Sequence, residues 1–296
     1  MNQIPKPVLD ATREIIGKSQ GEPVSLMRYS PTGGGCINHG GRLGTAKGDL
    51  FIKWNRIEGL PGMFISEEKG LDMLRAAGAI RIPRVIGTGE RGGWQFIVME
   101  FIPSASRASG YWELLGEQLA GLHRIGNAAY GLTHDNYMGS LHQFNAMRDS
   151  WVDFFIEQRL QVQLKLGIDN GRIDRLFLAK FERLYQLLPS LLIGESPSLV
   201  HGDLWGGNLI VDDKGEPCLI DPAVYYGHRE IDLAMTQLFG GFETRFYDVY
   251  NEVFPTAPGL QDRLDIYNLY PLLVHVNLFG QSYLHPVNST LDAFLK

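Results

Sequence analysis

The 296-residue sequence predicts an α+β fold with an antiparallel sheet in its N-terminal part and helices in its C-terminal part. Three apolar runs in the first hundred residues (24–29, 50–54 and 94–102) are separated by glycine-rich turns, a pattern typical of antiparallel strands. Helical periodicity dominates from Pro103 onward. We therefore predict a small sheet-containing lobe over residues 1–102 and a larger, mainly helical lobe over residues 103–296.

One main helix is expected within the small lobe, over Met63 to Ala77. Side chains spaced three or four residues apart share one face of a helix. Glu67 shares one face with the apolar residues Met63, Leu71 and Leu74, so we expect its side chain to point inward.

The larger lobe combines helices with one β-hairpin. Two short apolar runs, 209–211 and 218–220, are joined by Asp-Asp-Lys-Gly, which is a hairpin signal. Helical patterns precede and follow this hairpin. They include the stripe formed by Leu115, Leu119 and Leu122, and the segments 151–166, 175–188 and 264–284.

Composition and net charge argue against some classes of binding partner and favour one cellular compartment. The formal net charge is -6 and no polybasic run occurs, so we expect neither nucleic acid nor an anionic membrane as a partner. Two distant cysteines, no export signal and no apolar run of about 18 residues favour a cytoplasmic protein without a membrane span.

The strongest chemical motif is His201-Gly202-Asp203-Leu204-Trp205-Gly206-Gly207-Asn208, which fits the catalytic-loop pattern of kinases. In that pattern Asp203 accepts the proton of the attacking hydroxyl, and Asn208 offers an amide oxygen to Mg²⁺ on the phosphates. The alternative is an ordinary turn in which Asp203 caps a helix and Asn208 adopts a left-handed conformation.

Asp221 supplies the second half of this motif. It follows a buried apolar run thirteen positions after Asn208, where kinases place a metal-binding aspartate. Together the two side chains offer hard oxygen donors, which Mg²⁺ prefers. The alternative is an aspartate that only initiates a turn before Pro222.

The small lobe contains candidate nucleotide contacts. Lys53, at the end of a strand, can reach the α and β phosphates, and Glu67 is its expected partner. A glycine run between strands can bring backbone amides to phosphate oxygens. Alone it is more often a flexible turn, and Lys53 and Glu67 could be surface charges. The predicted phosphate loop consists of Gly33, Gly34, Gly35, Cys36, Ile37 and Asn38.

The end of the last small-lobe strand is expected to contact adenine through its backbone, although a plain edge strand is the alternative. This segment consists of Met99, Glu100, Phe101 and Ile102. With the loop, lysine and metal residues it predicts ATP and Mg²⁺ as cofactors. Asp232 is expected to brace the catalytic loop from the start of a helix.

The combination HGDLWGGN and DPAVYYGHREIDLAM, over residues 201–208 and 221–235, resembles the fructosamine kinase (ketosamine kinase) family. The likeness extends over nearly the whole chain. It implies a two-lobed fold similar to protein kinases and aminoglycoside phosphotransferases, and transfer of the ATP γ-phosphate to the 3-hydroxyl of a ketosamine sugar, free or protein-bound, in protein deglycation. By position it implies Asp203 as general base, Asn208 and Asp221 as metal ligands, Lys53 as phosphate anchor with Glu67, and Trp205 beside the sugar.

Two other functions compete with this interpretation. A related phosphotransferase could act on aminoglycosides, choline or homoserine with the same catalytic plan. A catalytically silent nucleotide-binding scaffold is a second alternative, although a scaffold has no need of Asp203.

Overall fold

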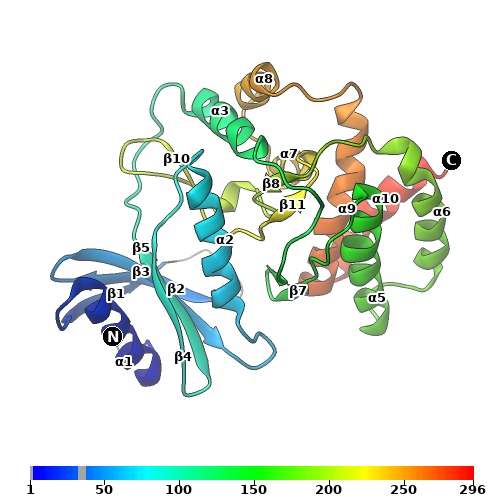
Figure 1. Ribbon diagram of the computed structural model, residues 1–296. Helices are drawn as coiled ribbons and strands as arrows, with labels where there is room; N and C mark the ends of the chain where they lie inside the picture. The colour runs from blue at the N-terminus through cyan, green and yellow to red at the C-terminus, as the bar shows by residue number, and fades with distance from the viewer. Residues whose placement is uncertain (1–2, 33–37) are drawn as a thin grey trace. The chain divides into compact units, whose positions relative to one another are not determined.

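The computed structural model describes residues 3–32 and 38–296, so Gly33 to Ile37 of the predicted phosphate loop lie outside the described residues. Internal contacts divide the chain into two compact units (Figure 1). The first unit comprises Met1–Tyr111 and Gly207–Pro222, and the second comprises Trp112–Gly206 and Ala223–Lys296. The predicted lobes, 1–102 and 103–296, follow a different division and stay a prediction.

A five-stranded antiparallel sheet forms the centre of the first unit, with the strand order β1-β2-β3-β5-β4. Three strands overlap the predicted apolar runs. The other two, β2 and β4, were not predicted because glycines interrupt their apolar pattern. The strands are β1 Leu26–Pro31, β2 His39–Thr45, β3 Gly48–Arg56, β4 Val85–Arg91 and β5 Trp94–Glu100.

Two helices pack against this sheet (Figure 1), α1 (Lys6–Gln20) and α2 (Met63–Ala77). Ile52 and Trp54 of β3 share an apolar cluster with α1. Because successive side chains of a strand point to opposite faces, Lys53 points away from this cluster and toward α2. The observed α2 has the predicted bounds.

The predicted hairpin is present, formed by β9 (Leu209–Val211) and β10 (Pro217–Leu219). It packs within the first unit. The backbone N–H of Leu219 donates to the carbonyl of Arg81 at 3.0 Å, and Ala108 N–H donates to the carbonyl of Gly215 at 3.0 Å. The segment that carries Asn208 and Asp221 is therefore held by the N-terminal sheet region.

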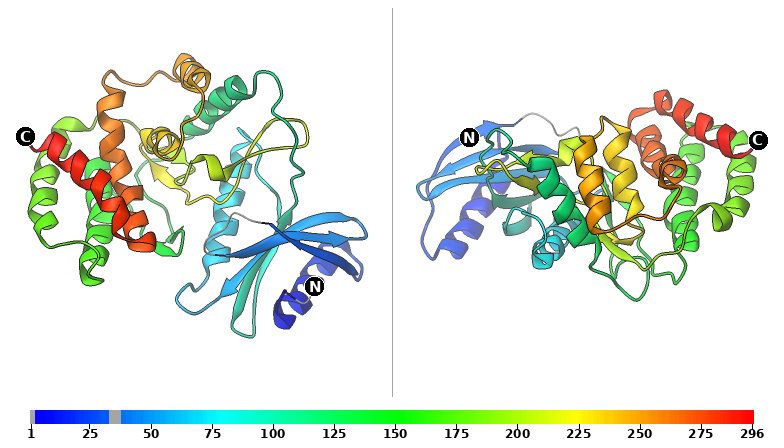
Figure 2. Two further views of the ribbon diagram at one scale, coloured as in Figure 1. Left: turned by 180° about the vertical axis from the view of Figure 1, so that it is seen from behind. Right: turned by 90° about the horizontal axis from the view of Figure 1, so that it is seen from above.

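Helices dominate the second unit, with α9 at its centre. Figure 2 shows α9, in orange, beside the red α10, and α5 and α7 also pack on it. Among the described helices none is both long and apolar enough to cross a lipid bilayer. The helices are α3 Tyr111–His123, α4 Trp151–Phe155, α5 Gln161–Asp169, α6 Leu176–Leu191, α7 Glu230–Leu238, α8 Thr244–Val253, α9 Leu260–Phe279 and α10 Leu284–Phe294. Short strands join them: β6 Asn136–Met138, β7 Leu141–Gln143, β8 Ser198–Val200 and β11 Tyr225–Gly227.

The prediction of one continuous helix over residues 151–166 is wrong in one respect. A π-helical turn, Ile156–Leu160, separates α4 from α5. This turn carries Arg159, whose fully buried guanidinium lies 4.1 Å from the centre of the Tyr225 ring and 4.6 Å from that of Phe154. We attribute the irregular turn to this burial of a cation among aromatic rings, which apolar periodicity does not reveal.

Candidate active site

Three predicted site residues meet in the first unit. Lys53 Nζ, on β3, donates to Glu67 Oε1 of α2 at 2.7 Å and also contacts the Asp221 carboxylate. The side chains of Lys53 and Glu67 are about nine-tenths buried, whereas that of Asp221 is 42% exposed. Because an unpaired buried ammonium is costly, the two carboxylates explain why the protein tolerates Lys53 at this position.

The charges of this cluster affect one another's pKa. Burial opposes the charged form of Lys53, but the attraction of Asp221 and Glu67 outweighs it and raises the pKa of the lysine. Burial, reinforced by the negative charge of Asp221, raises the pKa of Glu67 despite its bond to Lys53. Lys53 therefore remains a cation at neutral pH and can neutralise an anion.

Asp221 has an unusual backbone. Among the residues that the structure describes it is the one non-glycine with positive φ, at 54°. A left-handed conformation costs an L-residue about 1–2 kcal/mol, and such strain persists where the surroundings impose it. The ion pair with Lys53 is one such constraint, and Asp221 is one of the two predicted metal ligands.

Asn208 lies beside Asp221 at the base of the hairpin. Its Nδ2 donates to the Asp221 carbonyl at 3.4 Å, and its own carbonyl accepts from Ile220 N–H at 3.0 Å. Asn208 is buried and does not adopt the left-handed conformation that the alternative interpretation required. The two predicted metal ligands thus belong to one tightly bonded structure.

Asp203, in the second unit, lies in a tight turn of the predicted catalytic loop. Asp203 N–H donates to His201 Nδ1 at 3.3 Å, and its carbonyl accepts from Trp205 N–H at 3.2 Å. Gly202 has φ of 81°, and a Cβ there would lie 2.2 Å from the Ala223 carbonyl oxygen. Only glycine fits this position, so the turn depends on it.

Asp232 braces this loop from the first turn of α7, in the manner predicted. Its Oδ2 accepts from His201 N–H at 2.7 Å, and its Oδ1 accepts from Gly202 N–H at 2.9 Å. His123 Nε2 lies 3.1 Å from Oδ2. Burial raises the pKa of Asp232, but the bond from His123 and the loop amides more than compensate and lower it. A fully buried, charged carboxylate therefore fixes the backbone just before Asp203.

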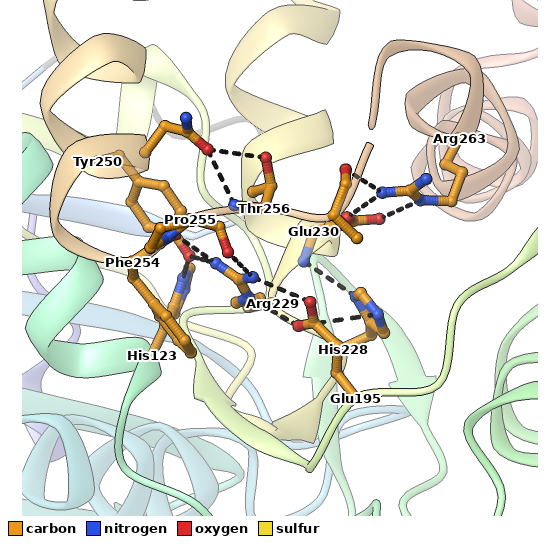
Figure 3. Close-up of polar contacts among 12 residues, drawn as sticks. His123, Glu195, His228, Arg229, Glu230, Tyr250, Phe254, Pro255, Thr256 and Arg263 are labelled. Carbon is orange, nitrogen blue, oxygen red and sulfur yellow. Dashed lines mark hydrogen bonds and ion pairs between the residues drawn. The ribbon is translucent and has the colours of Figure 1, made fainter. Parts of the chain in front are cut away.

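His123 is in turn connected to a second set of polar groups (Figure 3). With His123 Nε2 donating to Asp232, its Nδ1 accepts from the Tyr250 hydroxyl at 2.8 Å. Arg229 donates to the same hydroxyl at 3.3 Å and forms a two-point ion pair with Glu195 at 2.7 and 2.9 Å. The supporting role of these residues was not predicted from the sequence. The charged pair Arg229-Glu230, shortly before Asp232, was the signal that could have indicated it.

Trp205 lies in the second unit with its side chain partly exposed. Its ring is 6.2 Å from that of Phe239, which in turn lies 4.5 Å from His275. His275 is 5.3 Å from Phe279. These four rings form an aromatic surface that begins two residues after Asp203, and Trp205, Phe239 and Phe279 are each more than one third exposed.

The remaining predicted nucleotide residues lie in the first unit. Met99 and Ile102 are buried, and the guanidinium of Arg42 lies 4.9 Å from the centre of the Phe101 ring. Asn38 Oδ1 accepts from Asn55 Nδ2 at 2.6 Å. The contacts of Glu100 connect it to the hairpin and are described below.

Known proteins are similar to this chain in sequence and in fold. A family model described as fructosamine kinase matches residues 8–296. A probable ketoamine kinase from Synechocystis sp. is 38% identical over 95% of both chains, and the chloroplastic protein-ribulosamine 3-kinase of Arabidopsis thaliana is 37% identical over 97% of this chain and 88% of its own. A solved structure from Haemophilus somnus 129PT, named for fructosamine-3-kinase, has a TM-score of 0.88 and 28% identity over 96% of this chain and 97% of its own. Aminoglycoside phosphotransferase APH(4)-Ia has a TM-score of 0.65 at 14% identity over 96% and 98%, so it shares the fold.

Proposed function

Because this chain belongs to the fructosamine kinase family, we propose that it transfers the γ-phosphate of ATP to the sugar 3-hydroxyl of ketosamines such as fructosamine and ribulosamine. The observation that carries this proposal is the Lys53–Glu67–Asp221 cluster. It places a buried cation beside a carboxylate, an arrangement that suits the binding of a nucleotide phosphate and its metal.

On the phosphate side, Lys53 is proposed to neutralise charge on the α and β phosphates while Glu67 holds it in place. Asn208 and Asp221 provide an amide and a carboxylate oxygen, a donor set that suits Mg²⁺, which commonly takes its other ligands from phosphates and water. Bound Mg²⁺ would supply further neutralisation of the transferred phosphoryl group. The ion pair with Lys53 supports this assignment, because it already has the Asp221 carboxylate beside a positive charge.

On the acceptor side, Asp203 is proposed to accept a hydrogen bond from the 3-hydroxyl and to orient it toward phosphorus. Its turn is fixed by Gly202 and Asp232, so little reorganisation is needed when the hydroxyl binds. Trp205 is proposed to pack beside the sugar, where an exposed ring can cover its apolar face.

The decisive experiment measures ATP consumption by purified protein with Mg²⁺ and different acceptors. Ribulose- and fructose-modified lysine are compared with choline, homoserine and an aminoglycoside. We expect saturable activity with the ketosamines and none with the other acceptors. Activity on another acceptor would reject the proposed substrate, and nucleotide binding without any turnover would favour a scaffold.

The biological setting follows from the chemistry of the product. A ketosamine 3-phosphate is unstable and releases the amine, so we propose a role in protein deglycation. The cytoplasmic location and the lack of nucleic-acid or membrane partners stay predictions.

A further inference from the structure

Arg81, just before β4, connects two parts of the first unit that are far apart in sequence. Its Nη1 donates to Asp212 Oδ2 at 2.5 Å and to Asp213 Oδ1 at 2.7 Å, both in the β9–β10 turn. Its Nη2 donates to Glu100 Oε1 at 3.1 Å, at the end of β5. One guanidinium therefore binds three carboxylates.

On the hairpin side, Arg81 contacts the residue that shapes the turn. Asp212 is almost fully buried, and its Oδ1 accepts from Lys214 N–H at 2.8 Å and Glu216 N–H at 2.9 Å. Burial raises the pKa of Asp212, but the bonds from Arg81 and these two amides lower it overall. Without Arg81 this carboxylate would remain buried without its charged partner, a strongly unfavourable situation.

On the strand side, Glu100 ends β5 and belongs to the segment expected to contact adenine. Its second carboxylate oxygen, Oε2, accepts from Arg84 N–H at 3.2 Å, and its own N–H donates to the Arg84 carbonyl at 2.8 Å. The end of this strand is therefore held by hydrogen bonds to the backbone of Arg84 and to the side chain of Arg81.

The same hairpin carries the proposed metal ligands at its two ends. Asn208 immediately precedes β9, and Asp221 follows β10 after one residue. We propose that Arg81 is a positioning residue that sets the metal ligands and the adenine-contacting strand end relative to each other, so that Mg²⁺ and nucleotide bind cooperatively. This inference rests on the proposed function for the identity of the ligands, but it concerns nucleotide binding rather than the acceptor.

The test measures the dissociation constant of ADP by titration calorimetry, once with Mg²⁺ and once with a chelator. The constant measured with the chelator, divided by the constant measured with Mg²⁺, reports the cooperativity. In Arg81→Ala we expect this ratio to fall about tenfold, while metal-free affinity changes less than about threefold. The Arg81 carbonyl still accepts from Leu219 N–H in this variant, so the hairpin retains its backbone attachment.

A matched control removes a comparable pair elsewhere in the first unit. Arg91 binds Glu14 through two bonds of 2.8 and 2.7 Å on the exposed surface. Arg91→Ala should leave the ratio unchanged. Arg81→Lys keeps the charge but not the two-pronged geometry, so we expect it to restore the ratio only partly.

Glu100→Gln tests the strand side independently. Alone it should lower the ratio about threefold, and in the Arg81→Ala background it should have no further effect, because both changes interrupt the same connection. If Arg81→Ala does not fold, Arg81→Lys and Glu100→Gln decide the question. An unchanged ratio in folded variants would overturn the inference. Wild-type ADP binding that ignores Mg²⁺ would overturn it together with the metal assignment, whereas cooperative binding without ketosamine turnover would reject the proposed substrate alone.

Discussion

Asp203 should affect turnover far more than nucleotide binding. Asp203→Asn keeps the shape of the side chain and both backbone bonds of the turn, but the amide is a poor proton acceptor. We expect kcat to fall about a thousandfold, within the usual range for loss of a general base, with ADP affinity unchanged within about twofold. A coupled ADP-release assay and calorimetry measure the two quantities.

The control for this change is Asp248→Asn, which removes an exposed carboxylate from α8 in the same unit. It should behave as wild type in both assays. Equal loss of turnover and nucleotide affinity in Asp203→Asn would mean that the loop had unfolded, and near-normal turnover would remove Asp203 from the proposed role.

At the level of single residues, motif spacing was a good guide to which side chains come together. Lys53 and Glu67 were predicted as partners because their order along the chain matches a known catalytic plan, and the structure places them in contact. The contact of Asp221 with Lys53 was not predicted. Their roles in binding and catalysis stay predictions. The left-handed backbone of Asp221 and the triple contact of Arg81 were not predictable, because both depend on packing between distant segments.

At the level of elements, α7 stabilises the catalytic loop mainly through Asp232. In Asp232→Asn one acceptor oxygen becomes an N–H donor that faces a backbone N–H or His123. A buried donor without an acceptor costs about 1–3 kcal/mol, so we expect the free energy of unfolding to fall by about 2 kcal/mol. Turnover should fall as well, because the loop before Asp203 loses an anchor.

Urea unfolding followed by circular dichroism measures this stability. The matched change, Asp265→Asn, alters an exposed carboxylate on α9 and should shift stability by less than about 0.5 kcal/mol. Wild-type stability in Asp232→Asn would show that the brace is dispensable.

Some elements were predicted well from the apolar pattern, whereas α1, β2 and β4 were not predicted. Helix α2 and the β9–β10 hairpin match their predicted positions because their apolar spacing and turn residues agree. Strands β2 and β4 were missed since glycines interrupt the alternation. Glycine-rich strands depend on pairing with their neighbours, which local sequence does not encode.

For the whole molecule, the predicted family, fold class and enzyme class, a phosphotransferase acting on a sugar hydroxyl, are confirmed by the family match and the related structures. The combined motif over residues 201–208 and 221–235 is specific because its residues have separate predicted roles in catalysis and ligand binding. The grouping of Gly207–Pro222 with the first unit was not predicted. The packing partner of a short hairpin depends on long-range contacts such as those of Arg81, so the order of segments does not reveal it.

Stability of the whole chain should depend on pH through buried histidine. His228 is fully buried, stacks on Tyr267 at 5.5 Å and has its Nε2 4.0 Å from Glu195. Burial lowers the pKa of His228, so the unfolded chain takes up a proton at a higher pH than the folded chain does. The stability that neutral His228 contributes is complete above about pH 6.5 and is lost as the pH falls toward the lower folded value.

We therefore expect stability to decrease on acidification from pH 7.5 to 5.5, with His228 contributing up to about 1.4 kcal/mol per pH unit below its unfolded pKa. The raised pKa of Glu67 acts in the opposite direction, because its folded form takes up a proton more readily than the unfolded chain. Urea unfolding of His228→Gln over the same pH range isolates the contribution of this histidine. The slope of the free energy of unfolding against pH should be smaller in this variant than in wild type. His285→Gln, at an exposed histidine, should keep the wild-type slope. If His228→Gln also keeps that slope, His228 does not titrate between the folded and unfolded states in this range.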